Sequence, residues 1–162
     1  VMDKKNNVAS VTTTNGVGAG FLIPGTGIMP NNMLGEKHLN IHGFHKWESK
    51  QRIPSNICPT LMMDNNDKLT VLGSAGSSRI ISALTSVITN LINGKMTLEA
   101  AISSPRIHLE GEILHCEPTI SPTKYQTKDL VLWEEKSMYF GGVNACSFSE
   151  SIADERRDGF SI

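Results

Sequence analysis

Residues 69–93 constrain the fold most, because they predict a strand, a turn and a helix in direct succession. Residues 69–72 are apolar and partly β-branched, which favours a buried strand. The small residues at 73–78 predict a turn whose backbone other groups can approach closely. Ser77 or Ser78 can cap the helix that follows, and Gly94 suits its C-terminal end. The helix carries one wide apolar stripe, formed by Ile80, Ile81, Leu84, Val87, Ile88, Leu91 and Ile92.

A turn between a strand and a helix directs backbone N–H groups at the positive end of the helix dipole. We therefore interpret residues 73–78 as a candidate site for an anion, or for an oxygen that becomes negative during a reaction. A plain tight turn is the alternative. A phosphate-binding loop is disfavoured because the segment lacks the lysine of a P-loop.

Composition narrows the class of protein. Apolar residues make up 39% and charged residues 19% of the 162 positions, as is usual for a globular chain with a core. The net charge of −1 predicts no nucleic acid partner and no attraction to an anionic membrane surface. No run of about 18 apolar residues is present, so we expect no membrane span. The three cysteines do not suggest a disulfide framework, and we expect Cys58 to lie in the core.

The rest of the chain predicts short strands and few helices. We expect a hairpin over residues 1–14 with a strand at 8–14, a second hairpin over 59–72 and a third over 136–149. Short helices are predicted at 97–102 and 121–132, two strands at 106–116, and a polar tail on the surface. The chain would then be a single domain over residues 1–162, of class α+β, with an antiparallel sheet covered by helices.

Two polar stretches invite a ligand interpretation. The glycine-rich loop at 15–20 is followed by a predicted short strand at 21–24 and not by a helix, which excludes a dinucleotide-binding turn. A close backbone approach to a neighbouring segment or to a ligand is the favoured use of these glycines. His38, His42 and His45 lie in a polar loop without helical period, so we predict no metal site. No cofactor is expected either.

Five local motifs, in the same order along the chain, resemble the small subunit of the γ-glutamyltransferases, which are N-terminal-nucleophile hydrolases. The resemblance covers nearly the whole chain, and each motif alone would be weak. The matching segments are NNMLGE at 31–36, the segment ending in Pro-Thr-Leu at 59–61, the turn at 73–80, AAISSPRIH at 100–108 and DERRDG at 154–159.

The resemblance implies a four-layer αββα sandwich that a large subunit from the same precursor completes. It implies transfer of a γ-glutamyl group to water or to an amino acceptor, through an acyl-enzyme. In that family the precursor cleaves itself, and the new N-terminal threonine is the nucleophile. The match places this threonine just before Val1, so we expect further residues upstream, and no threonine within 1–162 is assigned to the role.

The resemblance also implies roles for particular residues. Thr12 and Thr14 match a pair of threonines, of which the second contacts the nucleophile. Asn15 and Glu36 match substrate-binding positions, although most members carry aspartate where Glu36 stands.

Further departures lie at two paired positions. Ser55 and Asn56 replace a serine pair that holds the substrate carboxylate. Gly76 and Ser77 replace the glycine pair whose N–H groups form the oxyanion hole. These departures leave open whether glutathione, another γ-glutamyl amide or a related acyl amide is the substrate.

Each of these residues also has an ordinary structural interpretation. The threonines could be simple strand residues, Glu36 a solvated charge and Ser55-Asn56 a turn. At the level of function, the alternative is a relative that binds an amino acid or a peptide without a nucleophile. The residue immediately before Val1 would separate the two hypotheses, because the enzyme needs a threonine, serine or cysteine there.

Overall fold

The structure is a computed structural model that describes residues 1–5, 7–121 and 129–161. The chain divides into two compact units. Unit 1 comprises Val1–Thr12 and Ile57–Ile162, and unit 2 comprises Thr13–Asn56. The expectation of a single domain over 1–162 stays a prediction.

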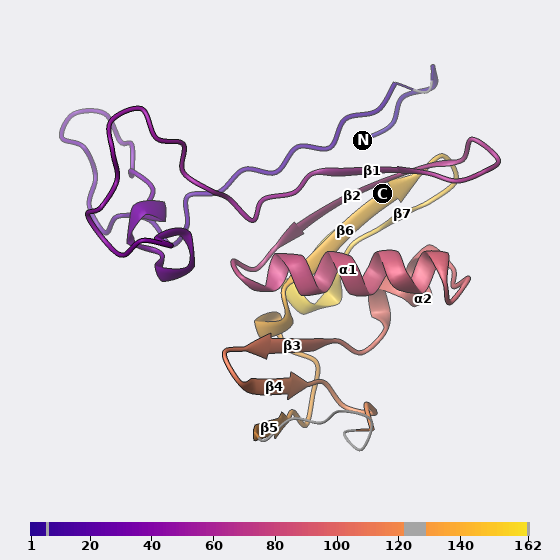
Figure 1. The fold of residues 1–162 in the computed structure, drawn as a ribbon. Helices are drawn as coiled ribbons and strands as arrows, with labels where there is room; N and C mark the ends of the chain where they lie inside the picture. Colours follow the sequence, from indigo (N-terminus) through magenta and orange to yellow (C-terminus); the bar gives the residue numbers. More distant parts are fainter. Residues whose placement is uncertain (6, 122–128, 162) are drawn as a thin grey trace. The chain divides into compact units, whose positions relative to one another are not determined.

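A four-stranded antiparallel sheet organises unit 1, with the strand order β1-β2-β6-β7 (Figure 1). The predicted hairpin at 59–72 is confirmed as β1 and β2. Its turn is held by the carboxylate of Asp64, which accepts the N–H groups of Asn66 and Lys68, each at 2.8 Å. The strands of this sheet are β1 (Thr60–Met63), β2 (Leu69–Ala75), β6 (Gly142–Ser147) and β7 (Ser151–Ile152).

Two helices cover one face of this sheet, α1 (Arg79–Ile92) and α2 (Leu98–Ser103). Both were predicted, and Thr97 caps α2 by accepting the N–H of Ala100 at 3.2 Å. Most of the predicted apolar stripe of α1 packs toward the sheet because its inward positions follow the helical period. Ile81 and Ile92 were included in that stripe wrongly, since each is 60% exposed. The buried core consists of Leu72, Ile80, Ala83, Leu84, Val87, Leu98, Ala101, Ile102, Val143 and Ala145.

A smaller sheet lies on the other side of α1 (Figure 1). Its strands are β3 (Ile107–Glu110), β4 (Ile113–Cys116) and β5 (Asp129–Leu132), with β4 antiparallel to β3 and parallel to β5. The two strands expected at 106–116 are confirmed. The helix expected at 121–132 is wrong over β5, and positions 122–128 of that prediction lie outside the described residues.

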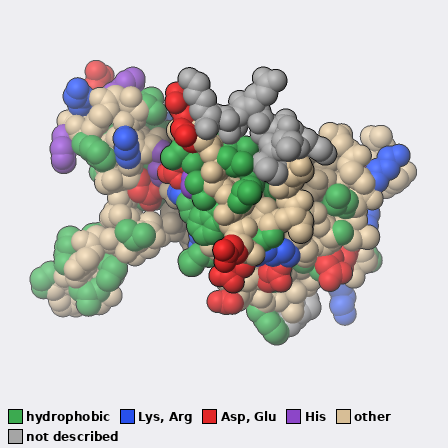
Figure 2. Space-filling view, turned by 90° about the horizontal axis from the view of Figure 1, so that it is seen from below, with side chains coloured by type: hydrophobic (Ala, Val, Ile, Leu, Met, Phe, Trp, Pro, Cys, Tyr) green, Lys and Arg blue, Asp and Glu red, His purple; other side chains and the backbone are tan. Residues whose placement is uncertain are grey.

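The smaller sheet leaves apolar side chains at the surface. Leu109, Leu130 and Leu132 are between 39% and 58% exposed. Seen from below, where this sheet lies, hydrophobic side chains gather beside acidic ones (Figure 2).

Two strands predicted near the N-terminus are wrong. Residues 1–9 do form a short hairpin, with a bridge between Met2 and Val8 and two backbone hydrogen bonds between Val1 and Ala9, but residues 9–14 form no strand. Residues 21–24 are irregular, with a turn that begins at Pro24. Ser10 meets β2 through its side chain, since its hydroxyl donates to the carbonyl of Leu72 at 2.8 Å. A side-chain bond of this kind does not build a sheet ladder, although the β-branched composition favours one.

The C-terminal part of the chain also differs from the prediction. Residues 138–140 are a 3-10 helix, and the strand after them pairs with β2 and β7 instead of closing a hairpin at Gly141. The tail was expected on the surface, but Asp154 and Arg156 are only 1% and 7% exposed. Their burial is explained by an ion-pair network described below.

Cys58 was expected in the core and is exposed. It lies in the irregular stretch 51–59 before β1. Among the described residues, Cys58, Cys116 and Cys146 are free thiols. Within that part of the chain, no helix combines the length and apolar character that crossing a membrane requires.

Candidate active site

The turn between β2 and α1 has the backbone geometry of an anion site. Gly76 has φ +139° and Ser77 has φ +57°, whereas Ser78 is right-handed helical with φ −60°. A left-handed residue followed by a right-handed one is a backbone combination found in anion-binding nests. The carbonyls point into the helix, because Gly76 O accepts the N–H of Arg79 at 3.0 Å and Ser77 O that of Ile80 at 3.2 Å.

Only glycine fits at position 76. A Cβ atom there would lie 2.7 Å from the Cα of Gly141, which is closer than real contacts allow. Gly141 itself has φ +73°, and a Cβ on it would lie 2.9 Å from the carbonyl oxygen of Ala75. The two glycines therefore let the end of β2 and the start of β6, which pair antiparallel, lie in close contact, and this contact fixes the position of the turn.

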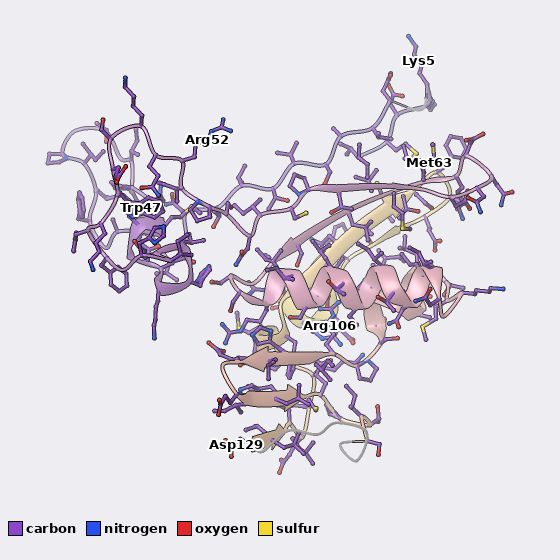
Figure 3. All side chains as sticks on the ribbon, in the orientation of Figure 1. Lys5, Trp47, Arg52, Met63, Arg106 and Asp129 are labelled. Atoms are coloured by element: carbon purple, nitrogen blue, oxygen red, sulfur yellow. The ribbon has the colours of Figure 1, made fainter. Side chains whose placement is uncertain are left out.

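Gly141 is held from the other side by a buried arginine. Arg106 is 1% exposed, and its Nη1 donates to the carbonyl of Gly141 at 3.3 Å. Its Nη2 pairs with Asp154 at 2.6 Å. Arg106 lies between α1 and β3 (Figure 3). The same Asp154 oxygen accepts the N–H of Val143 in β6 at 2.8 Å, so this ion pair ties the tail to the strand beside the turn.

A second buried pair extends this network. The guanidinium of Arg156 donates from Nε and Nη2 to the two oxygens of Glu117, at 2.6 and 2.5 Å. Arg156 also pairs with Asp154 at 3.2 Å. Two carboxylates and two guanidiniums therefore share one buried cluster. Burial alone would raise the pKa of Asp154, but Arg106 and the backbone donors of Val143 and Arg156 hold that pKa below its usual value.

Among the predicted site residues, Thr12, Gly76 and Ser77 belong to unit 1. The hydroxyl oxygen of Thr12 lies 3.3 Å from the position of a Cβ added to Gly73, so Thr12 packs against β2 three residues before the turn. The glycine at 73 leaves room for this hydroxyl.

The other predicted residues belong to unit 2, where the glycine-rich loop meets the NNMLGE segment. A Cβ on Gly16 would lie 2.0 Å from Oδ1 of Asn32 and 3.1 Å from Oε1 of Glu36. The expected close approach of these glycines is thus confirmed. Asn32 also accepts the N–H of Val17 at 2.8 Å, and Asn15 donates from Nδ2 to the carbonyl of Met29 at 3.1 Å.

Glu36 is placed by two short 3-10 helices, Met33–Gly35 and Lys37–Leu39, on either side of it. The amide of Asn40 donates to the carbonyl of Glu36 at 2.8 Å and accepts from the indole of Trp47 at 2.9 Å. Trp47 lies beside these helices (Figure 3). The carboxylate of Glu36 lies 3.3 Å from Nε2 of His38 and is partly accessible. Such a carboxylate can bind an ammonium group.

The remaining predicted residues lie in irregular backbone. Thr14 accepts the N–H of Gly16 at 2.9 Å and so shapes the glycine-rich loop. Ser55 is exposed and Asn56 is half-buried. The structure thus groups Asn15 and Glu36 around Gly16 within unit 2, and it groups Gly76 and Ser77 within unit 1. Their assigned roles stay predictions.

Sequence reasoning missed the residues that support these groups. Arg106, Asp154 and Arg156 lie inside two of the quoted motifs, but no role was assigned to them. Asn32 lies inside a third. Their place inside these motifs was the only sequence signal for them. No local pattern shows whether a polar residue within a motif is buried or exposed. Across the described part of the chain, no group of three or more His, Cys, Asp or Glu side chains is arranged to hold a metal ion.

Comparison with known proteins identifies the family to which this chain is similar. The sequence model of the family described as Gamma-glutamyltranspeptidase matches residues 1–160. The acylase ACY 1 proenzyme of Pseudomonas sp. (strain SE83) is 30% identical over 155 residues, which cover 92% of this chain and 27% of that protein. The glutathione hydrolase proenzyme of Bacillus subtilis (strain 168) is 32% identical over 110 residues, or 67% of this chain and 19% of that protein. The chain thus spans roughly a quarter or less of these relatives.

Solved structures match over nearly the whole chain. An acivicin-inhibited gamma-glutamyltranspeptidase has a TM-score of 0.78 and 28% identity, with 98% of this chain and 97% of that chain covered. The T380A mutant of the Helicobacter pylori enzyme has a TM-score of 0.75 and 29% identity, with 96% and 97% covered. The expected α+β fold of the N-terminal-nucleophile hydrolase type is confirmed by these matches.

Proposed function

Since this chain belongs to the gamma-glutamyltranspeptidase family, we propose that it is the small-subunit part of an enzyme that cleaves a γ-glutamyl or related acyl amide. A large subunit from the same precursor would complete both the four-layer sandwich and the site. The observation that carries the proposal is the turn at Gly76 and Ser77, where two residues of positive φ stand just before the start of α1, a backbone arrangement suited to an anion. The family match supports an enzyme over a non-catalytic binding relative.

The proposed reaction runs through an acyl-enzyme. A threonine before Val1 attacks the amide carbonyl through its hydroxyl, and its own α-amine takes the proton. Negative charge then develops on the carbonyl oxygen, where the N–H groups of Gly76 and Ser77 stabilise it. The C–N bond breaks and the amine leaves with a proton. Water or an amino acceptor attacks the ester in the second half, and the threonine is released.

The family match supports a set of substrate contacts. Thr14 would orient the nucleophile, and Thr12 would bind the substrate. Glu36 would pair with the α-ammonium group of the substrate, and Asn15 would also bind the substrate. Ser55 and Asn56 would hold the α-carboxylate. An asparagine in place of a serine changes the donors offered to that carboxylate, and the relative named an acylase proenzyme is 30% identical. Both facts support an acyl group other than that of glutathione as a second candidate.

The proposed function is tested with two anilides and the complete protein, expressed with its upstream polypeptide. One substrate is γ-glutamyl anilide, and the other is glutaryl anilide, which lacks only the α-amino group. We expect aniline release from at least one of them, and release should rise when a dipeptide acceptor is added if transfer occurs. A correctly processed protein that cleaves neither amide would contradict the proposal.

Replacing Glu36 with glutamine tests how the substrate is recognised. If Glu36 binds the ammonium group, Glu36→Gln should weaken the binding of γ-glutamyl anilide by roughly 2–5 kcal/mol, as loss of one partner of a buried charge pair does. Glutaryl anilide should be affected much less. The measurement is KM for both substrates. Glu48→Gln is the matched control, because Glu48 is exposed in the same unit. Equal effects on the two substrates would make Glu36 structural.

A further inference from the structure

We infer that Glu110, Arg79 and Tyr139 form a clamp of positioning residues that holds the Gly76–Ser78 turn in its reactive geometry. The inference rests on the proposed function of that turn. None of the three needs to touch the substrate, since each acts through the backbone on which it stands. The argument below uses contacts within unit 1 only.

One carboxylate oxygen joins two separate backbone segments. Oε2 of Glu110 accepts Nη2 of Arg79 at 2.6 Å and the hydroxyl of Tyr139 at 2.8 Å. The guanidinium carbon of Arg79 also lies 4.2 Å from the centre of the Tyr139 ring, a cation–π contact. Arg79 is the first residue of α1, and Tyr139 lies two residues before Gly141. The three side chains therefore connect the start of α1 to the segment that ends at Gly141.

These two segments are the ones that meet at the turn. Cβ positions built on Gly76 and Gly141 lie 3.4 and 3.5 Å from the Cβ of Arg79. Arg79 also closes the turn through its N–H, which bonds to the carbonyl of Gly76. If Arg79 moved away from Tyr139, the start of α1 would separate from Gly141, and the N–H groups at 76 and 77 would shift with it.

Tyr139 can serve as a fixed platform because other aromatic rings hold it. Trp133 stacks on it at 4.8 Å with an angle of 24° between the planes, and Phe140 meets it edge-on at 5.2 Å. The ring of His115 lies 4.8 Å away. Within the clamp, Arg79 is therefore the residue that moves when the contacts are weakened.

Glu110 keeps its charge near neutral pH. The hydrogen bond from Tyr139, followed by the nearby charge of Arg79, holds the pKa of Glu110 below its usual value even though its partial burial opposes this. Its side chain is 52% exposed, so its ion pair contributes little to global stability. A variant at this position should fold, which makes it suitable for separating geometry from stability.

The test compares Glu110→Gln with Glu112→Gln in the complete protein. Glu112 lies two residues further along the same hairpin and is exposed. We expect Glu110→Gln to lower kcat for the cleaved anilide roughly tenfold, because small displacements of oxyanion donors have large effects on rate. KM should change less than about twofold, and the melting temperature should match that of Glu112→Gln. Tyr139→Phe should lower kcat in the same direction, and the double variant should be no worse than the more affected single variant.

Amide hydrogen exchange of residues 76–80 gives a readout that needs no activity. Exchange in this segment should be faster in Glu110→Gln than in Glu112→Gln, with the rest of α1 unchanged. Equal kcat and equal exchange in the two variants would overturn the clamp. A wild-type protein that cleaves neither anilide would defeat the proposed function, and hydrogen exchange would still decide whether the clamp exists.

Discussion

Gly76→Ala is expected to lower turnover of the cleaved anilide by about 10²–10³, the usual effect of losing one oxyanion donor. Gly76 has φ +139°, a conformation that residues with a side chain rarely adopt, and its new Cβ would lie 2.7 Å from Gly141. The clash must move either the turn or the start of β6, so the donors leave their positions. Turnover is measured with the complete protein, and circular dichroism and a melting curve check that it is folded.

Substitutions at Ser77 are the matched controls. Ser77→Ala and Ser77→Gly should both stay within a few-fold of wild type, because the backbone N–H is retained. Glycine should also relieve the left-handed φ of +57°, which costs other residues about 1–2 kcal/mol. Proline is unsuitable here, since it fixes φ near −65°. An alanine at 77 as harmful as alanine at 76 would make the hydroxyl the working group. A folded Gly76→Ala protein of normal turnover would place the oxyanion hole elsewhere.

The second large effect is expected at the buried ion pairs. Glu117→Gln should reduce the free energy of unfolding by about 3–5 kcal/mol, the range for breaking a buried pair by removing one partner. The carboxylate of Glu117 accepts two hydrogen bonds from Arg156 and one from the N–H of Arg106, the last at 2.9 Å. In glutamine one of the two oxygens is replaced by an NH₂ group, which cannot accept a hydrogen bond from these groups. Urea unfolding of the complete protein measures the change.

The control for this prediction is Glu135→Gln, because Glu135 is exposed. Its change in the free energy of unfolding should stay within about 0.5 kcal/mol, as for ordinary surface substitutions. If Glu117→Gln destabilised the protein no more than Glu135→Gln does, the network around Arg156 would not hold the tail in place.

The local sequence predicted those parts of the fold in which the contacting residues are close together in the chain. The hairpin at 59–72 follows from turn residues between two apolar runs, and α1 follows from its apolar period and small residues at its start. The strand expected at 8–14 failed because β-branched composition does not reveal whether a partner strand is present. The prediction that the C-terminal tail lies on the surface failed for a related reason. The partner of Asp154 lies 48 residues away at Arg106, and no local pattern indicates such a pairing.

In the candidate site, too, local features could be predicted, whereas features that depend on distant residues could not. The turn at Gly76 was predicted from its strand and helix, and the contact of the glycine-rich loop was predicted from its glycines. The positive φ of Ser77 could not be predicted, because residues other than glycine rarely adopt it. The close contact of Gly76 with Gly141 joins residues far apart in the sequence, which no local pattern indicates. The clamp on Glu110 also could not be predicted, since its donors lie 31 residues before it and 29 residues after it in the chain.

Covalent trapping tests the central claim most directly, because the account requires an acyl-enzyme. The complete processed protein is incubated with acivicin, the compound that inhibits one of the structurally similar enzymes, and the intact mass of each chain is measured. We predict one adduct on the chain that contains residues 1–162, at a threonine just before Val1, and γ-glutamyl anilide present in excess should slow its formation. No adduct, or an adduct on another residue of either chain, would contradict the account.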